Sequence, residues 1–84
     1  MKIDLTCVRI EDIEGNEATV SVAQIVGNTL YMQGRTVDEC ELGRRIFKAD
    51  GQIEVSEQEA EMVRRVAMML PHVTKTGVLK QLNV

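Results

Sequence analysis

The sequence predicts an α+β fold in which an N-terminal β-hairpin packs on three to four short α-helices. Apolar and polar residues alternate with a period of two near the N-terminus, which suits a half-buried strand. A glycine–asparagine pair then supplies a tight turn, and three later segments each open with the pattern of a helix capping box. We expect one small domain, 1–84, with the hairpin in 1–20 and the helical part in 21–84.

The hairpin is predicted from residue spacing and turn chemistry. Residues 2–7 alternate between polar and apolar, and the parity changes after them, so either a bulge intervenes or the regular strand ends there. Gly15-Asn16 lies between strand-like stretches at 8–13 and 17–20. Glycine and asparagine adopt the positive φ that a tight hairpin turn needs, so these two stretches are expected to pair.

Three predicted helices begin with a Ser/Thr-x-x-Glu/Gln capping box, headed by Ser21, Thr36 and Ser56. In such a box the hydroxyl accepts the N3 amide proton, and the Glu or Gln side chain accepts the N–H of the cap residue. Each box opens a segment with apolar residues at helical spacing. The predicted helices cover 21–33, 36–49 and 57–70.

Glycine and proline mark the ends of these helices. Gly34 ends the first, Asp50-Gly51 ends the second, and Pro71 ends the third because the residue before a proline is pushed out of helical geometry. A short extended piece is expected near 53–55. Residues 73–82 have apolar residues at helical spacing and predict a fourth, shorter helix, in spite of a glycine in its middle.

The expected core consists of the apolar residues that these periodicities place inward. They are Leu5, Ile13, Val20, Val22, Ile25, Val26, Leu30, Cys40, Ile46, Phe47, Ile53, Val55, Val63, Val66, Leu70, Val78, Leu79 and Leu82.

Composition narrows the classes of function. Ten basic and thirteen acidic side chains give a net charge of −3, so no basic field is present to attract a phosphate backbone. Tyr31 and Phe47 are the only aromatic residues, too few for stacking single-stranded nucleic acid. No apolar stretch approaches the ~20 residues of a membrane span, and no signal peptide is recognisable. We therefore expect a cytoplasmic protein with no membrane contact.

The sequence contains few residues of the types that form catalytic and metal sites. Cys7 and Cys40 stand alone, without a C-x-x-C pair, and are expected to be reduced thiols that serve as small apolar side chains. His72 is the single imidazole and is expected at a helix cap or on the surface. The sequence therefore predicts no catalytic residue, no metal, no cofactor and no small-molecule substrate, and we expect a protein that is not an enzyme.

Residues 50–57 fit part of an EF-hand loop. Gly51 and Ile53 occupy the places of the glycine at position six and the apolar residue at position eight. Positions one and three would be Ile46 and Lys48, which bring no donor oxygen to Ca²⁺. We therefore expect a helix–loop–helix without metal, in which Ile53 makes a strand-like contact.

Two arginine pairs raise an alternative function. Arg44-Arg45 and Arg64-Arg65 would suit a small DNA-binding regulator with a helix-turn-helix-like helical part. However, Glu41 and Glu61 precede the second arginine of each pair by four residues, which predicts i,i+4 ion pairs on solvated helix faces. The third predicted helix also begins with acidic residues that would repel phosphates, so nucleic acid is not the expected partner.

The third predicted helix carries an apolar arc wider than one core-facing stripe needs. Met62, Val66 and Met69 lie on it. Two interpretations stay open: the small domain wraps this helix on both sides, or part of the arc contacts a partner, since methionine adapts to irregular surfaces. A partner, and a second copy of the chain in particular, is favoured because a domain of this size gains from burying a further apolar face.

Five short motifs span most of the chain: Ile-Asp-Leu-Thr (3–6), an acidic turn ending in glycine (11–15), Asn-x-Leu (28–30), Glu-Leu-Gly-Arg-Arg-Ile-Phe (41–47) and Ile-Glu-Val-Ser (53–56). In these motifs the chain resembles small proteins encoded in bacteriophage and prophage regions. That group has no assigned activity, so the resemblance carries over no functional residue. It implies a role in particle assembly or in modulating a host protein. We therefore expect a protein-interaction or assembly module, with the homodimer as one form.

Overall fold

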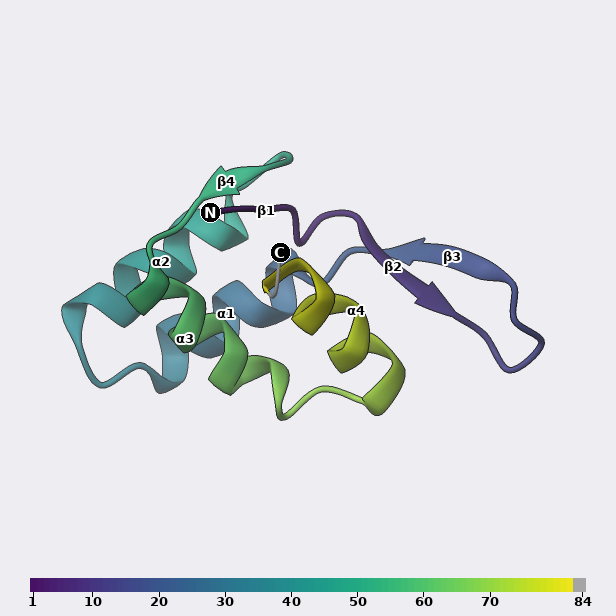
Figure 1. Cartoon of the computed structure of the whole chain (residues 1–84). Helices are drawn as coiled ribbons and strands as arrows, with labels where there is room; N and C mark the ends of the chain where they lie inside the picture. The colour runs from purple at the N-terminus through teal and green to yellow at the C-terminus, as the bar shows by residue number, and fades with distance from the viewer. Residues whose placement is uncertain (83–84) are drawn as a thin grey trace.

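The computed structural model describes residues 1–82, so the last two residues of the predicted helical part lie outside it. The elements are β1 (Lys2–Ile3), β2 (Val8–Glu11), β3 (Glu17–Val20), α1 (Ala23–Gln33), α2 (Val37–Phe47), β4 (Ile53–Glu54), α3 (Glu57–Ala67) and α4 (His72–Leu82). The predicted α+β class is confirmed. The molecule measures 41 × 21 × 21 Å, with the β2–β3 hairpin extending from one end of the helical body (Figure 1).

The hairpin forms where the turn residues predict it. Strands β2 and β3 pair antiparallel, from Val8 opposite Val20 to Glu11 opposite Glu17, and Gly15 has a φ of 84°. The first residues of the chain do not join this hairpin, so its predicted extent of 1–20 is too long. Strand β1 instead pairs antiparallel with β4.

A local turn separates β1 from the hairpin. The Asp4 carboxylate accepts the backbone N–H of Thr6 at 3.0 Å, together with a hydrogen bond from the Thr6 hydroxyl. Such a turn gives the backbone an alternative to strand pairing. The regular strand therefore ends at Ile3, well before the parity change near Cys7.

The three capping boxes have three different outcomes. Ser56 and Glu59 form a complete box at the start of α3. Thr36 accepts the N–H of Glu39 at 3.2 Å, but the Glu39 carboxylate accepts the N–H of Arg35 in place of that of the cap residue. The box predicted at Ser21 is wrong: α1 begins at Ala23, and its N-cap residue makes no side-chain cap hydrogen bond.

The start of α1 is determined by a long-range contact. The N–H of Val22 donates to the carbonyl oxygen of Leu5 at 2.8 Å, and the Val22 side chain is buried. This contact positions the chain between the hairpin and α1. Helices α2 and α3 also end two or three residues before their predicted limits, because hydrogen bonds between residues three apart tighten their last turns.

Helices α1 and α2 meet backbone to backbone at two glycines. A Cβ atom on Gly27 would lie 2.6 Å from the carbonyl oxygen of Gly43 and 2.7 Å from the nitrogen of Phe47. A Cβ atom on Gly43 would lie 2.6 Å from the carbonyl oxygen of Gly27. These separations leave no room for a side chain. We call this contact the glycine seam.

Gly77 serves the same purpose between α4 and the hairpin. A Cβ atom there would lie 2.5 Å from the carbonyl oxygen of Arg9 and 2.7 Å from the Cγ1 of Val8. The mid-helix glycine that weakens the helix prediction is therefore what lets α4 approach β2.

The core lies between the helices and the start of the chain. Of the predicted core residues, ten are buried and five are half-buried, but Ile13, Ile25 and Phe47 are 102%, 56% and 48% exposed. Ile13 lies in the hairpin turn, Ile25 lies opposite the buried face of α1, and Phe47 ends α2 beside the glycine seam. Six buried hydrophobic residues were not predicted: Ile3, Val8, Ala23, Leu42, Ala60 and Ala67.

The four helices contain eleven residues each. Within residues 1–82, no helix combines the length and apolar character that crossing a bilayer requires.

Alanine substitutions test the glycine seam. We expect Gly27→Ala and Gly43→Ala each to lower the free energy of unfolding by about 1–3 kcal/mol, because the added methyl group must push backbone atoms apart. This loss outweighs the ~1 kcal/mol by which alanine exceeds glycine in helix propensity. Urea denaturation measures it. Gly51→Ala is the matched control: a Cβ there meets nothing within 4 Å, and we expect a change below about 0.5 kcal/mol. Wild-type stability in both seam variants would contradict the close contact.

Candidate interaction surface

A hollow of about 130 Å³ lies between α1 and α3. Met62 and Val66 line it from α3, Met69 lines it from the turn that follows α3, and Leu30 and Gln33 line it from α1. We call this hollow the α1–α3 notch. The structure therefore places the three residues of the predicted partner surface around one depression.

These three side chains occupy different depths. Val66 is 6% exposed and belongs to the core, Met62 is half-buried, and Met69 is 62% exposed. The notch therefore has a buried apolar floor and an accessible apolar edge. Met68 is 60% exposed but does not line the notch.

An ion pair lies at the edge of the notch. The Nη2 of Arg65 donates to the Oε1 of Glu39 at 2.8 Å, and the N–H of Arg35 donates to its Oε2 at 2.8 Å. The hydrogen bond from Arg35 and then the guanidinium of Arg65 hold the pKa of Glu39 below its ordinary value. The carboxylate links the α1–α2 loop to α3.

A second ion pair joins α2 to the start of α3. Arg45 donates to the Oε2 of Glu59 at 2.6 Å and to the carbonyl oxygen of Glu54 at 2.6 Å. The N–H of Ser56 donates to the Oε1 of Glu59 at 2.9 Å. That backbone hydrogen bond, with Arg45 as the neighbouring charge, lowers the pKa of Glu59.

The arginine pairs therefore do not form the i,i+4 ion pairs that their spacing predicts. Arg45 bonds to α3 and Arg65 bonds to α2, because side chains on facing helices lie within reach of them. Arg64 pairs with Glu61, three residues earlier. The guanidinium of Arg44 lies 5.7 Å from the centre of the Tyr31 ring.

The EF-hand-like segment makes a strand contact. Ile53 lies opposite Ile3 in the β1–β4 pair, as the strand-like contact of the prediction requires. Within residues 1–82, no group of three or more His, Cys, Asp and Glu side chains is arranged to hold a metal ion.

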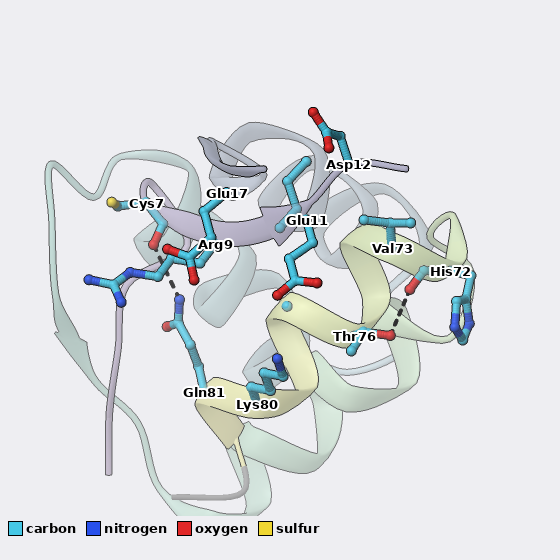
Figure 2. Close-up of a pocket in the computed structure, with 12 residues that line it drawn as sticks. Cys7, Arg9, Glu11, Asp12, Glu17, His72, Val73, Thr76, Lys80 and Gln81 are labelled. Carbon is cyan, nitrogen blue, oxygen red and sulfur yellow. Dashed lines mark hydrogen bonds between the residues drawn. The ribbon is translucent and has the colours of Figure 1, made fainter. Parts of the chain in front are cut away.

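A second hollow, of about 660 Å³, lies between the hairpin and α4 (Figure 2). Arg9, Glu11 and Glu17 line it from the hairpin, and Lys80 and Gln81 line it from α4. None of these five residues was predicted from the sequence as part of a site. Charges of both signs face the hollow, so it offers no single-sign field to a charged ligand.

Gln81 holds α4 against the start of the chain. Its Oε1 accepts the N–H of Asp4 at 2.7 Å, and its Nε2 donates to the carbonyl oxygens of Asp4 at 2.8 Å and Cys7 at 3.4 Å. The Cys7 side chain is exposed, so its expected role as a small apolar side chain is wrong, whereas Cys40 is half-buried. His72 is exposed at the start of α4 (Figure 2).

No protein-family model, curated protein or solved structure gives a match to this chain.

The pH dependence of stability tests the two lowered carboxyl pKa values. Because the folded pKa values of Glu39 and Glu59 lie below 4.5, their contribution is complete above about pH 4.5 and is lost as the pH falls through those lowered values. We expect the free energy of unfolding to fall in this acid range, and less steeply in the Glu39→Gln/Glu59→Gln double variant. Urea denaturation across this range measures both slopes.

Glu57→Gln is the matched control for this double variant. Glu57 begins α3 but makes no side-chain hydrogen bond within residues 1–82, so the wild-type slope should be retained. An unchanged slope in the double variant would contradict the role given to the two carboxylates.

Proposed function

We propose that this chain is a non-enzymatic protein-interaction or assembly module of the cytoplasm, and that it associates with itself as a homodimer. Its contact surface is the α1–α3 notch. The observation that carries the proposal is the accessible apolar edge at Met69, above a floor made by core residues.

The chemistry of the notch suits a protein partner. An unbranched thioether side chain adapts its shape to an incoming apolar group, so methionine is common on binding surfaces. The edge also carries Arg65, whose side chain is 66% exposed and whose five N–H donors are not all used by Glu39. An apolar centre beside a partly exposed arginine is typical of an interface.

The size of the chain supports self-association. A domain of 84 residues buries a smaller fraction of its surface on folding than a larger one, and gains stability from covering a further apolar face. We also propose the bacteriophage or prophage origin that the sequence motifs imply. An assembly role fits both the motifs and the notch.

The alternative function, a small DNA-binding regulator, has less support. Arg45, Arg64 and Arg65 are each paired with a glutamate. These glutamates place negative charge beside three arginines, which weakens the attraction of each for a phosphate. Helix α3 also presents acidic residues in its first turn, where a recognition helix contacts base edges.

Sedimentation equilibrium at micromolar concentration tests the homodimer. We expect a wild-type mass near twice the 9.4 kDa of the chain. Met69→Glu should raise the dissociation constant at least about tenfold, because the carboxylate must lose its water to enter an apolar contact.

Met68→Glu is the matched control for this variant. It changes the neighbouring methionine of nearly equal exposure, which does not line the notch, so the wild-type dissociation constant should be retained. A monomeric wild-type protein, or an equal loss of dimer affinity in both variants, would contradict the proposed contact surface.

A further inference from the structure

We propose that the occupant of the α1–α3 notch is the hairpin turn of a second copy, with Ile13 as the anchoring side chain. The insertion is reciprocal: the turn of each copy enters the notch of the other. The result is a dimer with two-fold symmetry. This inference rests on the proposed function and deepens it by naming the surface of the second copy that enters the notch.

Ile13 is the most exposed large apolar residue of the part of the chain that the structure describes. It is 102% exposed, in the turn that the hairpin carries away from the helical body (Figure 1). A β-branched side chain held entirely in water contributes nothing to the core of its own chain. Such a side chain is available as an apolar anchor for another molecule.

The turn holds Ile13 in a defined position. The Asp12 carboxylate accepts the N–H of Glu14 at 2.9 Å and that of Asn16 at 2.9 Å. The backbone of Asp12 also donates to the carbonyl oxygen of Asn16 at 2.9 Å and accepts the N–H of Gly15 at 3.0 Å. Four hydrogen bonds at one residue order the turn before any contact, which lowers the entropy that binding must overcome.

The size of the notch matches the side chain. Its volume is about 130 Å³, and Met62 and Val66 give its α3 wall an apolar surface beside Arg65. An apolar protein cavity of ~150 Å³ accommodates benzene, which has six carbon atoms. The four-carbon side chain of Ile13 fits a slightly smaller hollow, and the flexible edge at Met69 can close over it.

The charges around the two surfaces are complementary. Residues 11–17, which surround Ile13, carry four acidic side chains and no basic one. Two charged residues line the notch, Arg65 and its ion-pair partner Glu39. The arginine side chain is 66% exposed and the glutamate 14%, so the arginine is the charge that an incoming turn meets. Docking the turn beside Arg65 therefore brings opposite charges together, whereas two turns would meet with like charges. This favours contact of a turn with a notch, and reciprocal insertion is the two-fold arrangement that satisfies both copies.

A complementation experiment tests the pairing of turn with notch. Ile13→Ser removes the anchor and Met69→Glu blocks the notch, so the homodimer of either variant loses both contacts. An equimolar mixture retains one contact, between the intact turn of the Met69→Glu chain and the intact notch of the Ile13→Ser chain. We expect the dissociation constant of each variant alone to exceed that of wild type at least about tenfold. The mixture should form a heterodimer that native mass spectrometry separates by mass from either homodimer.

Ile25→Ser is the matched control, since Ile25 is an exposed isoleucine that does not line the notch, and it should dimerise like wild type. Ile13→Ser with wild-type affinity, or a mixture that stays monomeric, would overturn the inference. If Met69→Glu dissociates the dimer and Ile13→Ser does not, the notch is the interface but Ile13 is not the residue that occupies it. Dissociation by Thr19→Glu, with Ile13→Ser unaffected, would show that the second copy pairs with the exposed strand β3 instead. A wild-type monomer would remove the proposed self-association together with this inference.

Discussion

The arrangement of the helices depends on the glycine seam between α1 and α2. At Gly27 and Gly43 the two backbones approach so closely that neither position has room for a Cβ atom. The seam consists of main-chain atoms, so the buried apolar side chains of α1 pack against other parts of the chain. Val26 and Leu30 are buried in the core that α1 shares with α3 and the start of the chain. Gly77 applies the same constraint to α4, whose backbone approaches β2.

A core organised in this way leaves apolar side chains outside it. Phe47 and Tyr31 flank the seam and are about half exposed, at 48% and 47%, because the seam has no space for their rings. On the other side of α1, the contact with α3 includes Val66 but leaves Met69 beyond its edge. The proposed interface follows from this geometry, since the notch is the place where packing of α1 against α3 is incomplete. The hairpin is bound to the body through β2, which leaves Ile13 without contacts in its own chain.

The candidate surface could be predicted in part. Met62 and Met69 were found because helical periodicity predicts that they share an arc, and that arc exceeds what one core needs. The wall contributed by Leu30 and Gln33 was not found, because no local pattern states which helix lies opposite. The exposure of Ile13 was also missed: this residue was assigned to the core, whereas the hairpin extends beyond the body that would cover it.

The amino-acid sequence by itself determined the features that depend on residues close together in the chain. The hairpin turn follows from Gly15, and the start of α3 follows from Ser56 and Glu59, because every group involved lies within a few residues. Tertiary structure alone decided which partner each group takes when several are in reach. Val22 binds a carbonyl of the N-terminal segment and overrides a local cap, and Arg65 pairs with a glutamate on another helix. The physical reason is that local hydrogen bonds need only the backbone conformation of one segment, whereas ion pairs and burial need the positions of segments that folding brings together.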